Sequence, residues 1–257
     1  MTPTWSWAQY QLTGGVNYTD FSYEEDLTPP LKSTEKTTFF APFLQGKIFF
    51  PQLNESFVQF EAEMSGNVNS HFDGTTLKGV PVTDTNVQAF ARVEADFYWN
   101  FVPSFWAYVG FGYRYWNRYL SGGSGYREIY TWNYIPVGVR YKQIVSDVFS
   151  WGADLSYRAM TGGQIKIIFS ETVTNGEDET LTLGDKAGFK LQFPMEYKFP
   201  NTKLGLLTSP WYEESSIGAS SFKYNSTPTT DGPLGYIREP SSKTTQYGLM
   251  LGMIAYF

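Results

Sequence analysis

Three side chains that could act together in hydrolysis lie in one short stretch, Ser70-His71-Phe72-Asp73. A hydroxyl, an imidazole and a carboxylate are the groups of a nucleophilic triad, but in a triad they come from separate elements that the fold orients. His71 is the only histidine, and the chain has no cysteine. These counts argue against thiolate chemistry, most metal sites and most histidine-based acid–base pairs. We therefore interpret His71 as an exposed loop residue and expect no catalytic site, metal or cofactor.

The remaining side chains of chemical interest are charged residues that recur at alternate positions of several segments. Both signs are present, which favours ion pairs over a surface of one charge. The acidic run Gly176-Glu177-Asp178-Glu179 lacks the spaced ligands of a calcium loop. The candidate residues are Lys47, Glu61, Glu63, Arg92, Glu94, Asp96, Arg114, Arg118, Arg140, Asp154, Arg158, Lys190, Glu196 and Lys198.

Composition narrows the class of protein that could carry these residues. The chain has 257 residues, of which 19% are aromatic and 17% charged, a combination that argues against intrinsic disorder. The net charge of −6 offers no basic surface, so we expect no nucleic-acid partner. No apolar run reaches the length of a transmembrane helix. The start Met1-Thr2-Pro3-Thr4-Trp5 does not resemble a secretory leader, which is expected either of a cytosolic protein or of one whose leader has been removed.

The elements that position the charged residues are strands, as the alternation of apolar and polar residues indicates. From Val87 to Trp99 every second residue is apolar, while Gln88, Arg92 and Glu94 share the other parity. The segments 57–64 and 189–198 alternate in the same way, and no convincing amphipathic helix is present. Further strands are predicted at 9–20, 38–50, 105–120, 128–144, 151–169, 203–219 and 244–257, which gives ten in all.

The connections between these strands alternate in length. Short links lie near Pro51, Pro103, Ser146 and Asn201. Longer polar links are expected at 21–37, 66–85, 121–127, 170–186 and 220–243. The pattern predicts an up-and-down meander that forms one domain over residues 1–257, because no linker interrupts it. Long strands in a meander must close to avoid open edges, and closure gives a barrel.

Three features favour a barrel in a membrane, with its apolar face toward lipid. The alternating runs are long enough for tilted strands to cross a bilayer. The polar parity carries many charges, and the apolar parity often presents alanine. Aromatic residues gather beside the short links, as at a membrane interface. This predicted girdle comprises Phe49, Phe50, Trp99, Phe101, Phe105, Trp106, Phe149, Trp151 and Phe199.

The final segment, from Gln246 to Phe257, alternates and ends on an aromatic residue. It resembles the last strand of Gram-negative outer-membrane β-barrel proteins, and the barrel also resembles the omptin surface proteases in size. The resemblance implies that Phe257 is read by the barrel-assembly machinery and that the protein lies in the bacterial outer membrane. It also implies periplasmic termini, exposed long loops, and contact with outer-membrane lipid and lipopolysaccharide. The omptin pattern of paired aspartates with an Asp–His pair is not matched.

The sequence leaves the function open between several hypotheses. The leading one is a non-enzymatic barrel, either a structural or surface-interaction protein with a lumen filled by ion pairs, or a narrow channel for small solutes. Gly110 and Gly112 would leave space on one wall of such a channel. An open lumen would admit small solutes, whereas a filled one would leave ligands to the long loops. The alternatives are a membrane-embedded surface hydrolase and a soluble ligand-binding barrel with its faces reversed.

Overall fold

The computed structural model describes residues 10–76, 79–121, 125–171, 176–225 and 235–257, and nearly all of its regular structure is strand. Its described helix, η1, is a single turn, so no described helix is long and apolar enough to cross a membrane. The elements are β1 (Tyr10–Glu25), β2 (Ser33–Phe50), η1 (Pro51–Leu53), β3 (Ser56–Met64), β4 (Val68–Thr75), β5 (Pro81–Val102), β6 (Phe105–Tyr119), β7 (Arg127–Ile144), β8 (Phe149–Ile168), β9 (Glu179–Leu183), β10 (Ala187–Gln192), β11 (Met195–Lys198), β12 (Leu204–Ile217), β13 (Lys223–Asn225), β14 (Gly235–Ile237) and β15 (Ser242–Tyr256).

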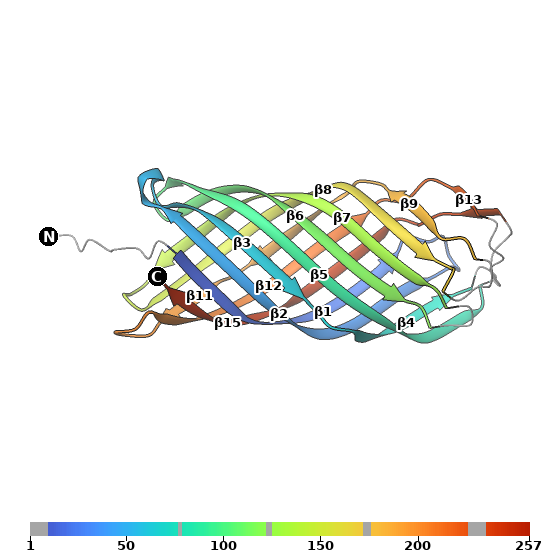
Figure 1. Ribbon diagram of the computed structural model, residues 1–257, viewed down its shortest axis with the longest axis horizontal. Helices are drawn as coiled ribbons and strands as arrows, with labels where there is room; N and C mark the ends of the chain where they lie inside the picture. The colour runs from blue at the N-terminus through green and yellow to red at the C-terminus, as the bar shows by residue number, and fades with distance from the viewer. Residues whose placement is uncertain (1–9, 77–78, 122–124, 172–175, 226–234) are drawn as a thin grey trace.

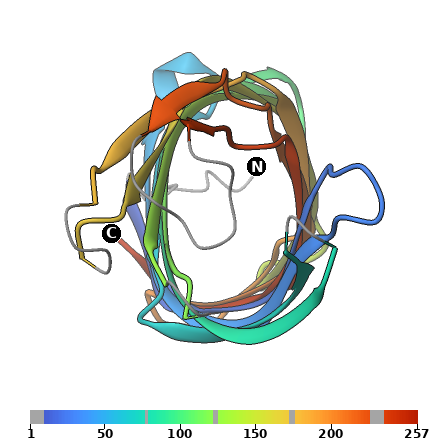
Figure 2. The ribbon, with the colours of Figure 1, turned by 90° about the vertical axis from the view of Figure 1, so that its right-hand side faces the viewer.

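The strands form one closed antiparallel barrel. Thirteen strands fill ten positions in the wall, because β3 and β4 lie end to end, as do β9, β10 and β11. β1 pairs with both β2 and β15, which closes the sheet and leaves no edge. Figure 1 shows the tilted strands from the side, and Figure 2 shows the ring that they form. The predicted ten-stranded fold is therefore confirmed.

One end of the barrel holds the two ends of the described chain, and we call it the terminus end. Here Phe257 N–H donates to the carbonyl of Tyr10 at 3.0 Å. The four short links predicted from the sequence all lie at this end, between β2 and β3, β5 and β6, β7 and β8, and β11 and β12. Asn54, Ser104 and Asn201 adopt positive φ there, because such tight turns need left-handed residues.

At the opposite end, the loop end, the strands run further than the sequence predicted. Parts of the predicted long links 21–37, 66–85 and 170–186 lie in strands. These parts are residues 21–25, 33–37, 68–75, 81–85 and 179–183. The remaining links are correspondingly shorter. The reason is visible in β1, where buried Phe21 and Tyr23 alternate with more exposed residues beyond the apolar part of the strand. The wall thus continues past the apolar outer surface.

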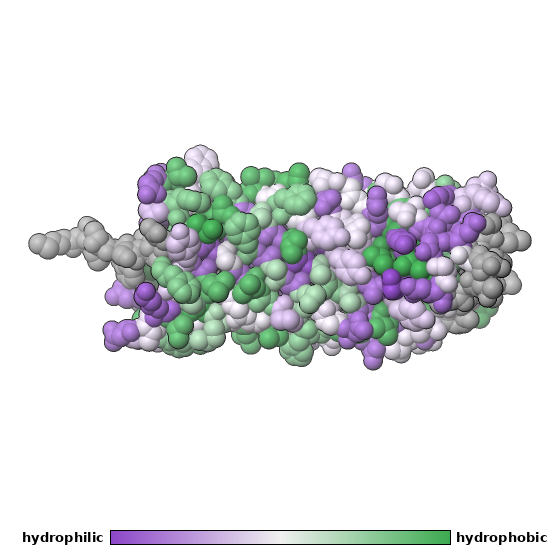
Figure 3. Space-filling view, viewed as in Figure 1, coloured by the Kyte–Doolittle hydropathy of each residue, from purple (hydrophilic) through white to green (hydrophobic). Residues whose placement is uncertain are grey.

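The outer surface of the barrel is apolar over the part nearest the terminus end. Large apolar side chains are exposed on it, including Leu12, Leu44, Phe60, Val93 and Leu251. Figure 3 shows this band in green and a mostly polar surface nearer the loop end. The reversed arrangement of a soluble barrel, with this parity inside, is therefore wrong for this structure. A band of exposed apolar residues around a closed barrel is the arrangement of barrels that lie in lipid.

A bulge in β8 changes which residues face inward. Trp132 pairs with Gly163, whereas Tyr134 pairs with Met160, so β8 has one extra residue opposite β7. Gly162 takes a φ of +115° at this point, which favours glycine. Inward residues are even-numbered before the bulge, such as Arg158, and odd-numbered after it, such as Ile165.

Candidate functional site: the lumen

The structure brings nearly all of the candidate charged residues into the interior of the barrel. Glu61, Asp96, Arg114, Arg118, Asp154, Arg158 and Lys190 are buried there. Lys47, Glu63, Arg92, Glu94, Arg140 and Glu196 are nearly buried, with side chains 10–13% exposed. Lys198 differs, because it lies exposed at the terminus end with its Nζ 5.5 Å from the centre of the Tyr256 ring.

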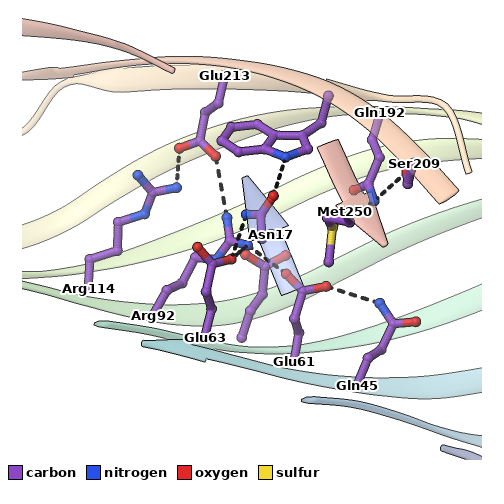
Figure 4. A network of polar contacts seen from close by, with 12 residues as sticks. Asn17, Gln45, Glu61, Glu63, Arg92, Arg114, Gln192, Ser209, Glu213 and Met250 are labelled. Atoms are coloured by element: carbon purple, nitrogen blue, oxygen red, sulfur yellow. Dashed lines mark hydrogen bonds and ion pairs between the residues drawn. The ribbon is translucent and has the colours of Figure 1, made fainter. Parts of the chain in front are cut away.

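The middle of the lumen is bridged from wall to wall by three arginines that meet one carboxylate. Glu213 on β12 is 1% exposed and pairs with Arg158 Nη1 at 3.0 Å, with Arg92 Nη1 at 3.6 Å and with Arg114 Nη2. β5, which carries Arg92, and β12 are separated by four strand positions in either direction around the wall. The Arg92–Glu213 pair therefore spans the full width of the barrel (Figure 4).

A second set of carboxylates surrounds the same arginines. Arg92 Nη2 contacts Glu61 at 2.6 Å and Glu63 at 3.0 Å, while Arg158 Nη2 contacts Glu94 at 2.9 Å. With Arg114, Lys190 and Glu213, these residues form what we call the central network, in which four cations face four glutamates. Buried charges are tolerated when they are paired and hydrogen-bonded in this way. Neutral groups add bonds: Asn17 Nδ2 donates to Glu63, Gln45 Nε2 to Glu61, and the Tyr134 hydroxyl to Glu94.

Gly110 and Gly112 do not leave open space beside this network, contrary to the sequence-based expectation. A methyl group on Gly112 would clash with the Tyr134 ring, and one on Gly110 would clash with Asp96 Oδ1. The absence of these side chains lets Tyr134 and Asp96 lie over the backbone of β6. The two glycines thus serve close packing inside the lumen.

Aromatic side chains fill the next layer toward the loop end. Phe39 stacks on Phe90 with ring centres 4.9 Å apart, and Trp116 stacks on Tyr130 at 4.6 Å. Phe21 on β1 contacts both Phe90 and Trp116. The space between this layer and the central network is only about 50 Å³, which is too small for anything larger than a water or two.

Beyond the aromatic layer, one arginine gathers several glutamates in what we call the loop-end cluster. Arg118 pairs with Glu35 at 2.7 Å, with Glu128 at 3.1 Å and with Glu25 at 3.7 Å. Glu239, from the segment between β14 and β15, enters the same cluster and accepts a hydrogen bond from the Tyr130 hydroxyl at 2.8 Å. Burial and the nearby Glu128 and Glu25 raise the pKa of Glu239 well above its usual range.

The terminus end of the lumen is hollow instead. A cavity of about 840 Å³ opens there, which we call the terminus-end cavity. Lys47 and Lys142 both reach Glu196, at 3.3 and 2.6 Å. Arg140 is held by Asp154 at 2.7 Å and lies 4.3 Å from the centre of the Tyr98 ring.

The predicted girdle residues divide between the two faces of the wall. Trp99, Phe101, Phe105 and Trp151 are exposed on the outer face, while Phe50, Phe149 and Phe199 are half-buried. Phe49 and Trp106 lie on the inner side instead, where they pack with Phe57, so their assignment to the outer girdle is wrong. Their parity in β2 and β6 decides this, since alternate residues face opposite sides. Phe257 is exposed at the terminus end.

The hydroxyl, imidazole and carboxylate of the Ser70-His71-Phe72-Asp73 stretch do not converge. All lie on β4, where Ser70 is buried and donates to Glu35, while neighbouring His71 is exposed on the other face. Asp73 pairs with Lys32 at 2.6 Å. Among the described residues no group of histidine, cysteine and acidic side chains is arranged to hold a metal. The acidic run near Glu177 also makes local contacts, with Asp178 paired to Lys166 and Glu179 to Lys223.

Sequence reasoning missed several residues of these networks. Glu213 is the most connected, yet its segment contains adjacent Glu213 and Glu214, so charge alone did not show which one faces inward. A usable signal was its parity with Gly205 and Ser209, opposite to the apolar Leu204 and Leu206. Glu35 and Glu239 fell in segments interpreted as loops, and Lys142 was also not selected.

Comparisons with known proteins agree with this architecture. No family model matches the chain, and no curated protein matches it in sequence. The outer membrane protease OmpT from Escherichia coli aligns over 100% of both chains with 10% identity and a TM-score of 0.53. The translocator domain of autotransporter NalP from Neisseria meningitidis has 7% identity and a TM-score of 0.48, with 99% of this chain and 90% of that chain covered. OprG from Pseudomonas aeruginosa has 13% identity and a TM-score of 0.40, with 96% and 95% covered.

At these identities the likeness concerns the fold, and among these three structures it rests on OmpT. Closure, strand number and the apolar outer band agree with it. The chain therefore has the ten-stranded fold of the bacterial outer-membrane β-barrel proteins.

Proposed function

We propose that this protein is an outer-membrane barrel whose lumen is sealed by side chains and which presents its loop end at the cell surface as an interaction surface. The observation that carries the proposal is the Arg92–Glu213 pair across the full width of the barrel. The aromatic layer lies directly beside it and leaves about 50 Å³. A hydrated solute would have to break both layers to pass.

The loop end has the features of a presented surface. The wall extends past the apolar band, and Phe222, Tyr224 and Tyr236, in or beside the paired strands β13 and β14, are each at least 63% exposed. Exposed aromatic side chains at the tips of a rigid scaffold are common in binding surfaces. The hydrolase alternative has no support from a specific contact, since Ser70 and His71 face opposite sides of β4.

Single-channel recording tests the seal. We expect refolded protein, shown to be folded and inserted, to give no stable conductance steps in a planar bilayer, because the central network closes the path. An Arg114→Ala/Arg118→Ala variant is measured beside it. It removes Arg114 from the central network and Arg118 from the loop-end cluster. Stable steps in the wild type, with ion selectivity altered in the variant, would establish a channel and contradict the proposal.

Surface labelling tests the orientation. Because the chain has no cysteine, single substitutions give clean labels: Tyr224→Cys at the loop end and Lys203→Cys as the matched control at the terminus end. In intact Gram-negative cells a membrane-impermeant maleimide should label Tyr224→Cys alone, and Lys203→Cys only after the outer membrane is opened. The reverse pattern would show that the loop end faces the periplasm.

A further inference from the structure

The terminus-end cavity has the size and enclosure of a small-molecule site. Its volume of about 840 Å³ lies within the range of roughly 300–1,000 Å³ typical of ligand pockets. Gln45, Gln59 and Arg140 contribute to its lining, and the central network closes the lumen beyond it. The cavity is therefore a blind pocket that opens at one end of the barrel.

One side of the cavity is a rigid aromatic wall. Phe57 stacks on Tyr98 with ring centres 4.4 Å apart and an interplanar angle of 9°. Trp106 meets Phe57 edge-on with ring centres 6.4 Å apart, and Phe49 packs on Phe57 with ring centres 5.3 Å apart. Phe49, Phe57 and Trp106 line the cavity, so it offers apolar ring surface that is already held in place.

Three cationic side chains lie on the wall of the cavity. Lys47, Lys142 and Arg140 line it together with Glu55 and Glu196, and Arg140 pairs with Asp154. Arg140 has its own partner in Asp154, but the two lysines share Glu196. Each lysine ammonium has three donors, so both retain capacity to bind a further acceptor.

Neutral polar side chains also line the cavity near the lysines. The side chain of Gln11 is 6% exposed. Gln59 accepts a hydrogen bond from Arg140 through its Oε1 at 3.2 Å. Such convergent polar groups beside an apolar wall are what fixes a ligand's orientation in a pocket.

We propose that the terminus-end cavity binds a small organic anion with a flat, apolar ring part. The anionic group would lie between Lys47 and Lys142, and the ring against Phe49, Phe57 and Trp106. This site is separate from the seal, because it stops short of the central network. Its occupancy therefore does not require that the lumen conduct.

The test uses 2-naphthoate as the probe and isothermal titration calorimetry on the full chain in lipid nanodiscs. Empty nanodiscs measure partitioning into lipid, and 2-naphthalenemethanol provides an uncharged analogue of the same shape. We expect saturable binding of 2-naphthoate to the protein, with the alcohol at least about tenfold weaker because it lacks the charge-assisted bonds.

Two variants locate the site. Lys142→Gln should weaken 2-naphthoate binding about tenfold, and Lys142→Arg should restore most of it, because the positive charge returns. Lys243→Gln, at an exposed position on the outer face, is the matched control and should leave binding unchanged. Lys142 has a partly exposed side chain, and the fold of each variant is checked by its resistance to heat in detergent.

Three results would overturn the proposal. One is uptake equal to that of empty nanodiscs. Another is equal affinity for the acid and the alcohol, which would indicate nonspecific partitioning. The third is an unchanged affinity in folded Lys142→Gln. None of these results bears on conductance, so failure here is distinguishable from failure of the sealed-barrel proposal.

Discussion

The two halves of the lumen are made from the same strands but are filled differently. The terminus half holds a cavity of about 840 Å³, whereas the space between the central network and the aromatic layer is about 50 Å³. The inward residues explain the contrast. On β1 they are Gln11 and Thr13 near the terminus end, but Phe21 and Tyr23 toward the loop end. In a barrel of fixed width, the sizes of the alternate residues decide whether the interior is solid or hollow.

The largest expected difference between the halves is in the cost of removing a carboxylate. Glu213→Ala leaves Arg92, Arg114 and Arg158 without their shared partner in a buried site, which should cost about 3–5 kcal/mol of unfolding free energy. Glu196→Ala, in the hollow half, should cost less, because Lys142 is 29% exposed and water can replace the bond. Urea unfolding in lipid vesicles, followed by tryptophan fluorescence, measures both.

The neighbouring residue supplies the control for this comparison. Glu214 lies next to Glu213 but faces outward, where it pairs with exposed Lys243. Glu214→Ala should leave the unfolding free energy nearly unchanged, since exposed ion pairs contribute little. If Glu213→Ala behaved like Glu214→Ala, the central network could not be the structural seal that we describe.

A smaller effect should distinguish the loop end by its pH dependence. The pKa of Glu239 is raised above its unfolded value, chiefly by burial and then by Glu128 and Glu25. Its neutral form therefore stabilises the segment 235–241 fully below the unfolded pKa of about 4.3, and this stability is lost as the pH rises through the raised pKa. The charged and titratable groups that face it are Tyr23, Glu25, Arg118, Glu128 and Tyr130.

Cleavage by trypsin after Arg238 measures this release. As the pH is raised above the unfolded pKa, the wild-type rate should rise relative to that of Glu239→Gln, whose amide cannot ionise. The comparison with the variant at each pH removes the pH dependence of trypsin itself. A constant ratio would show that ionisation of Glu239 does not loosen the loop end.

Sequence alternation was enough to predict the barrel, because two-residue periodicity and alternating link lengths are local properties. It identified the Arg92 and Glu94 face of β5 and the apolar face that carries Val93. It misplaced the ends of the strands, since β1 and β4 continue beyond the apolar band with a polar outer face that resembles a loop. It also misassigned Phe49 and Trp106, which share the aromatic character of the girdle but not its parity.

What the sequence by itself determined is the alternation that gives a closed barrel with charges inside and apolar side chains outside. Only the tertiary structure decided which charges meet. Arg92 and Glu213 are far apart along the chain and come together because closure places β5 and β12 on opposite walls. Closure also decided that Gly112 gives room to Tyr134 and not to solvent, and that a cavity lies at the terminus end. Contacts across a lumen depend on circumference and stagger, which no local pattern of residues encodes.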